Sequence, residues 1–242
     1  MEPIQNSPAA TPAASNQLLA GAALAGGALL FATAKKARAQ SSPIPFSDEI
    51  FGTGDVKVLN YALALEALEA DLYVQALQRL TGGGTNALGT QIPGLGLADS
   101  NAGVRYVRDF GAIEAAHRDF FIGALGANAI TAAGKPLNTA KFDFDIETKS
   151  EQDVLNLLQT VEAAGVRAYI GAIPSFVTTT YLQTAAAIQG TEARHTAVIT
   201  AIINQRFGST QSVAPLAGEN NGIDQPLAPQ AILDTVSPLI VL

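Results

Sequence analysis

Apolar residues recur every three or four positions in four long segments of the chain, a spacing that places them on one face of an α-helix. Helix-ending glycines follow the first segment, at Gly82, Gly83 and Gly84. Asp55 is expected to cap the first helix, and Ser150 with Asp153 has the spacing of a capping box. The sequence therefore predicts four helices, at about 55–80, 101–125, 150–173 and 179–206.

The connections between these segments predict how the helices are ordered in space. We interpret the first and third connections as short, and the segment from Gly126 to Lys149 as a long crossover. Short connections pair neighbouring helices antiparallel, whereas a long one lets the chain return along the bundle. The expected fold is all-α: a four-helix bundle, up-down-down-up, with one long crossover between helices 2 and 3, over residues 55–207.

Both histidines of the chain follow a glutamate by three residues, in Glu114-Ala-Ala-His117 and Glu192-Ala-Arg-His195. Three residues are just under one helical turn, so both side chains of each motif project from the same face. That face is otherwise apolar in both helices. The spacing predicts two pairs of metal-ligand atoms, one on the second helix and one on the fourth.

The other two helices each carry a glutamate within the apolar face, Glu66 and Glu162. Each is followed seven residues later by a tyrosine, Tyr73 or Tyr169. One glutamate on each of two helices, and a Glu-x-x-His motif on each of two others, form the ligand set of di-iron and di-manganese bundles. The predicted metal ligands are therefore Glu66, Glu114, His117, Glu162, Glu192 and His195.

Burial of four carboxylates in an apolar bundle is costly unless cations compensate their charge. Two divalent ions would balance the four glutamates, and oxygen-rich ligation with one histidine per metal suits iron or manganese. Tyr73 and Tyr169 are candidates for hydrogen bonds to ligands or for redox-active phenols, with simple core packing as the alternative. Glu69 is interpreted as a solvated or ion-paired residue, with a role at the metal site as the alternative.

Composition narrows the function classes. The chain of 242 residues is 48% hydrophobic and has a net charge of −7, without a basic patch in the predicted bundle, which argues against nucleic acid as a partner. Cysteine is absent, which excludes disulfides, thiolate metal sites and a cysteine nucleophile. Neither histidine has a serine in helix register, so nucleophilic hydrolase chemistry is not expected.

The N-terminal segment resembles an export signal. An apolar run from Leu18 to Ala34 precedes two lysines and the triplet Ala37-Arg38-Ala39, with cleavage expected after Ala39. A membrane anchor that leaves the bundle in the cytoplasm and a disordered leader are the alternatives. The expected organisation is a leader over 1–39, a linker over 40–54, the bundle over 55–207 and a C-terminal tail over 208–242, in an exported, periplasmic or extracellular protein.

The sequence resembles the ferritin-like superfamily, and within it the desiccation-related branch. The resemblance is carried by the segments Val58–Ala70, Gly165–Pro174 and Thr191–His195, and it covers about residues 50–207. It implies a ferritin-like bundle with Glu66 and Glu162 as terminal carboxylates and Glu114 and Glu192 as bridging carboxylates. It further implies that His117 and His195 are the nitrogen ligands.

Three functions follow as expectations. The first is a di-metal protein with two iron or manganese ions per chain, which oxidises Fe(II) or consumes dioxygen or peroxide under oxidative or desiccation stress. The second is a dimanganese catalase-like enzyme, and the third a non-enzymatic stress protein whose metals stabilise the bundle. Metal ions with dioxygen or peroxide are the expected partners. A homo-oligomer is left open, and a membrane would be contacted only through an uncleaved N-terminal segment.

Overall fold

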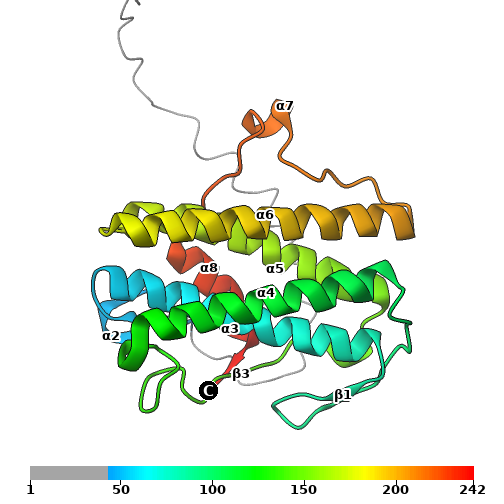
Figure 1. Cartoon of the computed structure of the whole chain (residues 1–242), viewed down its shortest axis with the longest axis horizontal. Coiled ribbons are helices and arrows are strands. Elements are labelled where there is room, and N and C mark those ends of the chain that lie inside the picture. The colour runs from blue at the N-terminus through cyan, green and yellow to red at the C-terminus, as the bar shows by residue number, and fades with distance from the viewer. Residues whose placement is uncertain (1–42) are drawn as a thin grey trace, which may run out of the picture. The chain divides into compact units, whose positions relative to one another are not determined.

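The computed structural model describes residues 43–242, and four long helices dominate that part of the chain (Figure 1). They coincide with the four predicted segments to within two residues, which confirms the all-α prediction. Of the predicted N-terminal segments, the leader and residues 40–42 of the linker lie outside the described residues. No helix within 43–242 is long and apolar enough to cross a membrane. The long helices are α3 (Asp55–Leu80), α4 (Ala102–Leu125), α5 (Glu151–Ala172) and α6 (Thr179–Phe207).

One of the two predicted helix caps is confirmed, at the start of α5, and the other, at the start of α3, is wrong. Ser150 Oγ accepts a hydrogen bond from Asp153 N, and Asp153 bonds back to Ser150 N, so the predicted capping box is confirmed. The prediction that Asp55 caps α3 is wrong, because Gly54 occupies the N-cap position. Instead the Asp55 carboxylate accepts hydrogen bonds from Val177 N and Thr178 N, at 2.8 and 3.0 Å, just before α6. Asp55 therefore joins two helix starts that are distant in sequence.

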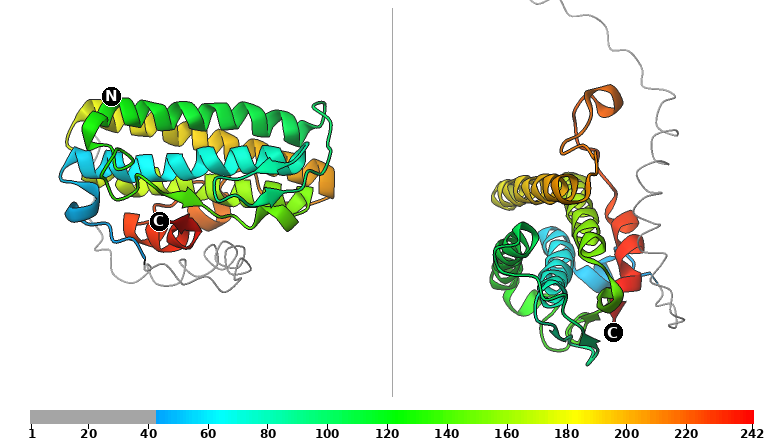
Figure 2. Two further views of the ribbon diagram at one scale, coloured as in Figure 1. Left: turned by 90° about the horizontal axis from the view of Figure 1, so that it is seen from below. Right: turned by 90° about the vertical axis from the view of Figure 1, so that its right-hand side faces the viewer.

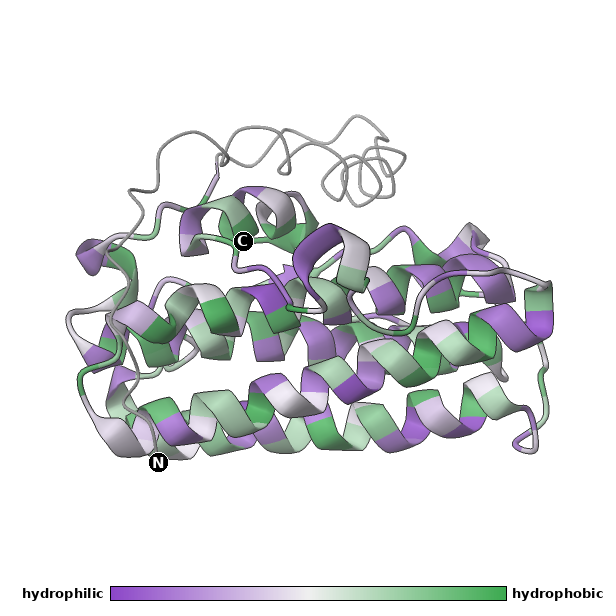
Figure 3. Ribbon diagram, turned by 90° about the horizontal axis from the view of Figure 1, so that it is seen from above, coloured by the Kyte–Doolittle hydropathy of each residue, from purple (hydrophilic) through white to green (hydrophobic). Residues whose placement is uncertain are grey.

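The bundle consists of two helical hairpins. Helix α3 packs mainly against α4, and α5 against α6, while α3 and α5 join the two hairpins (Figure 2). In Figure 1, α3 and α6 run in one direction and α4 and α5 in the other. This is the predicted up-down-down-up order. Seen from above, hydrophilic and hydrophobic residues alternate along the long helices, as expected for helices with one buried face (Figure 3).

The crossover from α4 to α5 runs along α3 and is held there by polar side chains of α3. The buried Asn60 side chain donates to Asn128 O and accepts from Ile130 N at the start of the crossover. Gln75 donates to Phe142 O in its middle, and Arg79 to Lys149 O at its end. Because these contacts advance along both segments together, the crossover spans the bundle from end to end.

The first connection is longer than the sequence suggested. It covers residues 81–101, nearly as many as the crossover at 126–150, so its interpretation as short is wrong. A small antiparallel hairpin, β1 (Gly84–Thr85) with β2 (Gln91–Ile92), folds it back against α3. The two helices it joins are antiparallel nonetheless, because the hairpin keeps the ends of the connection close together.

The C-terminal segment after α6 returns to the bundle. Helix α8 (Pro229–Val236) packs against α5, and β4 (Ile240–Val241) pairs antiparallel with β3 (Lys141–Phe142) of the crossover. A Cβ atom at Gly171 of α5 would lie 1.8 Å from Leu227 O, so only glycine permits this close approach. The short elements are α2 (Asp48–Phe51), η1 (Gly126–Asn128), η2 (Ile146–Thr148), η3 (Ile173–Ser175), α7 (Ala217–Asn220) and η4 (Ser237–Leu239).

Candidate metal centre

Four glutamates meet in the middle of the bundle, and each comes from a different long helix. Glu66, Glu114, Glu162 and Glu192 all have an exposed fraction of 0%. Each lies on the apolar face that its helix turns to the other three, so the packing that buries the apolar residues also buries the carboxylates. The six predicted ligands are thereby brought together.

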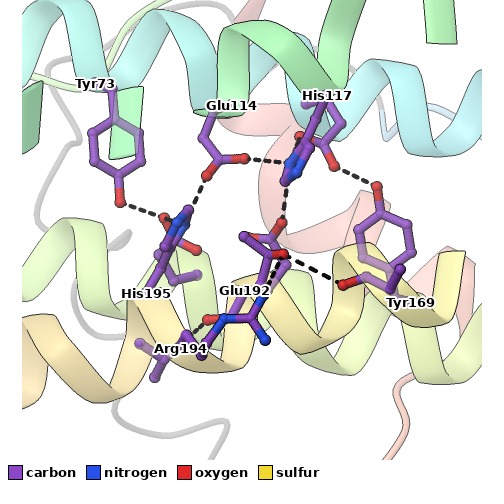
Figure 4. Close-up of polar contacts among 12 residues, drawn as sticks. Tyr73, Glu114, His117, Tyr169, Glu192, Arg194 and His195 are labelled. Atoms are coloured by element: carbon purple, nitrogen blue, oxygen red, sulfur yellow. Dashed lines mark hydrogen bonds and ion pairs between the residues drawn. The ribbon is translucent and has the colours of Figure 1, made fainter. Parts of the chain in front are cut away.

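The donor atoms form two groups that share members (Figure 4). We call Glu66, Glu114, His117 and Glu192 the first half-site, and Glu114, Glu162, Glu192 and His195 the second half-site. In each group, one donor atom from every residue lies within 4.8 Å of all the others. Glu114 and Glu192 belong to both groups, which is the arrangement of carboxylates that bridge two ions.

Glu114 lies between the two imidazoles. Its Oε2 is 2.9 Å from His117 Nδ1, and its Oε1 is 2.7 Å from His195 Nδ1. His117 Nδ1 also lies 3.4 Å from Glu66 Oε2, and His195 Nδ1 lies 3.3 Å from Glu162 Oε1. Both histidines therefore present Nδ1 to the carboxylates, and this nitrogen is the candidate ligand atom.

The two tyrosines bind the terminal carboxylates in a crossed pattern. The hydroxyl of Tyr73 on α3 donates to Glu162 on α5, and that of Tyr169 on α5 donates to Glu66 on α3. Because α3 and α5 are antiparallel, a tyrosine two turns beyond the glutamate of its own helix reaches the glutamate of the other. Each tyrosine thus orients a candidate ligand that is distant in sequence.

Burial dominates the electrostatics of the carboxylates. It raises the pKa of Glu66 to about 8, against the opposing hydrogen bond to His117 and with the charges of Glu192 and Glu114 adding to the rise. Burial likewise raises the pKa of Glu162 well above its usual range, and Glu192 adds to this. The pKa of Glu114 is lowered, because hydrogen bonds to both histidines outweigh its burial.

Burial and hydrogen bonds also have opposite effects on the pKa of His117, and the hydrogen bonds have the larger effect. Burial by itself lowers the pKa of His117, but hydrogen bonds to Glu114, Glu192 and Glu66 raise it to about 12. The protonated imidazole therefore compensates part of the carboxylate charge.

Unpartnered atoms test whether these residues suit metal ions. Within residues 43–242, several buried oxygen and nitrogen atoms of the six residues lie close to one another without the directed geometry of a hydrogen bond: Glu66 Oε2, Glu114 Oε1, Glu162 Oε2, both oxygens of Glu192 and His195 Nδ1. Buried polar atoms in folded proteins are nearly always satisfied by a hydrogen bond or a metal. The unpartnered atoms are the ones that would coordinate, so the residues fit a pair of divalent cations.

The two histidines differ in their surroundings. His195 is 2% exposed, and its ring stacks on Phe110 of α4 with 3.9 Å between the centroids. The side chain of His117 is 15% exposed. The sequence did not indicate this difference, because Phe110 was expected only as an apolar residue of the inner face.

Glu69 is placed differently from the sequence interpretation. It is 3% exposed, and no hydrogen bond or ion pair holds its carboxylate within residues 43–242, so its interpretation as a solvated or ion-paired residue is wrong. Burial raises its pKa well above the usual range, and the charges of Glu192, Glu66 and Glu114 add to this. Its place in the apolar stripe beside Glu66 was a signal in the sequence that could have indicated burial.

Comparison with known proteins agrees with this architecture. Residues 54–205, which include α3, α4, α5 and all but the last two residues of α6, match the family described as the ferritin-like domain. No curated protein and no solved structure shows significant similarity to the chain.

Proposed function

Because the chain belongs to the ferritin-like domain family, we propose that it is a di-metal carboxylate protein that binds two iron or manganese ions. In this proposal the ions serve to oxidise Fe(II) or to consume dioxygen or peroxide. The resemblance of its helices to the desiccation-related branch supports a role in oxidative or desiccation stress.

One observation carries the proposal: two groups of four potential ligand atoms share Glu114 and Glu192, and several of the carboxylate oxygens are buried without a hydrogen-bond partner among residues 43–242. A structural zinc site would need one closed tetrahedral set, commonly with thiolates. Two overlapping sets of carboxylate oxygens with one imidazole each suit iron or manganese instead.

The protein's own residues would bind and orient the pair. Glu66 with His117, and Glu162 with His195, would each hold one ion, and Glu114 and Glu192 would hold both. A bound pair of redox-active ions supplies electrons to dioxygen or peroxide. Tyr73 and Tyr169 fix the terminal carboxylates by hydrogen bonds, and the full burial of the glutamates excludes bulk water. The exposed part of His117 is the side from which small molecules would approach.

Elemental analysis and an oxidation assay test the proposal. Protein purified from its native host is expected to contain two iron or manganese ions per chain, and metal-free protein to oxidise added Fe(II) stoichiometrically with dioxygen. Glu162→Ala is expected to abolish the oxidation and to leave the helix content by circular dichroism unchanged. Glu219→Ala, which removes an exposed glutamate of α7, is the matched control and should oxidise Fe(II) like the wild type. Oxidation at the wild-type rate by Glu162→Ala would exclude the proposal.

The deep burial of the second half-site favours one other candidate, a non-enzymatic protein stabilised by its metals. Glu162 and His195 are 0% and 2% exposed, and metal binding to such a site adds directly to folding free energy. A melting temperature that rises with added metal, without turnover of Fe(II), dioxygen or peroxide, would support this candidate over the redox protein.

A further inference from the structure

A small cavity lies between α3 and α5, beside the candidate metal centre but not formed by its ligands. Alanines of both helices form part of its wall, Ala62 on α3 and Ala168 and Ala172 on α5. The cavity has room for about one molecule of the size of water. Packed cores contain few spaces of this size, and this one adjoins a residue that binds a candidate ligand.

The wall of the cavity is apolar. Two tyrosines, Tyr61 and Tyr169, line it, but no polar atom contributes to its surface. A buried water molecule needs several polar partners, so the cavity does not suit water. For the same reason it does not suit hydrogen peroxide, whose two hydroxyl groups need hydrogen bonds, or an ion. Dioxygen is small and apolar and needs no hydrogen bond, so it is the oxidant that fits this wall.

Tyr169 connects the cavity to the first half-site. Its side chain lines the cavity, and its hydroxyl donates a hydrogen bond to Glu66. Leu65, another residue of the wall, directly precedes Glu66 in α3. Figure 4 shows Tyr169 on the side of the centre where His117 lies. A molecule in the cavity is therefore one residue away from a candidate ligand of the first half-site.

The outer end of the cavity lies near the protein surface. Among the residues that line it, Phe176 is half-buried and the others are buried. Phe176 follows η3, beyond the C-terminal end of α5, and the next residue, Val177, is 83% exposed. Dioxygen would therefore enter beside Phe176, and the exposed side of His117 remains the approach for ions and polar molecules.

Larger side chains occupy the equivalent positions beside the second half-site. Both inner helices carry a terminal glutamate with a tyrosine seven residues later. The residue four places before the glutamate is Ala62 on α3 but Leu158 on α5. The residue directly before the tyrosine is Ala168 on α5 but Leu72 on α3, and both leucines are 0% exposed. The two alanines therefore leave open, beside the first half-site, the space that leucines fill beside the second.

We propose that this cavity binds dioxygen and supplies it to the first half-site. The inference rests on the proposed function and selects dioxygen, in place of hydrogen peroxide, as the oxidant. An apolar molecule is transferred favourably from water into apolar surroundings, so the cavity raises the concentration of dioxygen beside Tyr169. A polar oxidant gains nothing from the same wall.

NMR of metal-free protein under dioxygen pressure tests the binding without any turnover, because dioxygen is paramagnetic and speeds the relaxation of protons near it. The methyl protons of Ala62 and Leu65 should relax severalfold faster than those of Leu158, which is also buried but lies beside the second half-site. Ala168→Leu, which introduces the larger residue of the equivalent position, should abolish this difference. Equal relaxation of the three residues in the wild type would overturn the inference.

Stopped-flow oxidation of Fe(II) tests the supply of dioxygen. Ala168→Leu, and the smaller change Ala172→Val, should slow oxidation by dioxygen severalfold. Oxidation by hydrogen peroxide and the affinity for Co(II) in calorimetry should not change. Ala76→Val is the matched control, because Ala76 is buried three residues after Tyr73, as Ala172 is after Tyr169, but does not line the cavity.

Unchanged oxidation by dioxygen in both cavity variants would overturn the inference and leave the proposed function intact. Equal slowing in Ala76→Val, or equal slowing with hydrogen peroxide, would also overturn it, because the effect would then come from altered packing. Absence of Co(II), Fe(II) and Mn(II) binding to the wild type would instead refute the proposed function, and the NMR measurement would still decide whether the cavity binds dioxygen.

Discussion

The two half-sites use the same kinds of ligand but lie in different surroundings. Each has one terminal glutamate and one histidine that presents Nδ1. In each, a tyrosine donates a hydrogen bond to the terminal glutamate, from α3 to α5 in one case and from α5 to α3 in the other. In the second half-site, however, Phe110 stacks on His195, while His117 of the first half-site is partly exposed. The comparison teaches that a repeated ligand motif does not produce two equivalent sites, because the neighbours that control access and charge do not repeat.

The two half-sites carry different residues at equivalent positions near their ligands. Phe110 lies four residues before Glu114, and the residue four places before Glu192 is Ile188, which has no ring to stack on an imidazole. Glu69 and Gly165 differ in the same way one turn after the terminal glutamates. The first half-site is therefore the more accessible, because the side chain of His117 is 15% exposed, and the second half-site is the more enclosed.

The largest effect is expected from a substitution that disrupts both half-sites together. Glu114→Ala deletes the carboxylate whose two oxygens face the two histidines, so neither ion keeps a full set of ligands. Elemental analysis of the purified variant should find no stoichiometric metal, whereas the matched change Glu219→Ala on α7 should leave two ions per chain. A variant of Glu114 that still binds two ions would show that this residue does not bridge the half-sites.

The pH dependence of stability should follow the raised pKa values of the first half-site. Between its ordinary pKa of 4.5 and its folded value of about 8, Glu66 keeps in the native protein a proton that it has lost in the unfolded chain. His117 does the same between 6.5 and about 12. The native state binds more protons in both ranges, so the free energy of unfolding falls as the pH rises.

For metal-free protein we therefore expect the free energy of unfolding to fall by roughly a few kcal/mol between about pH 5 and pH 8. Urea denaturation at several pH values measures it, and Glu66→Gln should flatten the dependence. Metal affinity should change in the opposite direction, because binding displaces protons from the ligands. A free energy of unfolding independent of pH over this range would contradict the electrostatics described for Glu66 and His117.

A change at Phe110 should make the two half-sites more alike. Phe110→Ala removes the ring that stacks on His195 and leaves a cavity in the core, at a cost of about 3 kcal/mol in stability. With the ring absent, the ion of the second half-site should be lost to a chelator at a rate closer to that of the first. Stopped-flow transfer of Co(II) to EDTA measures both rates, and Phe121→Ala, a core change on the same helix, is the control. Chelation rates unchanged from the wild type would show that Phe110 does not shield the second half-site.

The smallest expected effect comes from the tyrosines. Tyr73→Phe removes the hydrogen bond to Glu162, and Tyr169→Phe the one to Glu66, while both keep the ring in the core. Loss of a hydrogen bond that orients a ligand typically lowers metal affinity by about tenfold or somewhat more. Because the bonds are crossed, Tyr73→Phe should weaken the second half-site and Tyr169→Phe the first, in calorimetric titrations. The opposite assignment would refute the crossed arrangement.

Local sequence was sufficient to predict the four helices and the candidate ligands. A helix depends on its own periodicity, caps and terminating glycines, all within a few residues of each other, and the capping box of Ser150 and Asp153 illustrates this. The same periodicity placed Glu66, Glu114, Glu162 and Glu192 on the faces that became buried.

Other features depended on contacts between segments distant in sequence, which only the tertiary structure decided. Asp55 lies where a helix cap would be expected but binds the backbone before α6, and Tyr73 reaches a glutamate of another helix. Glu69 is buried because α5 has a glycine opposite it. Helical periodicity tells which side of a helix faces inward, but the neighbour on that side is determined by how the helices pack. For this reason the sequence by itself determined the candidate ligands, and the packing of the helices determined how the two half-sites differ.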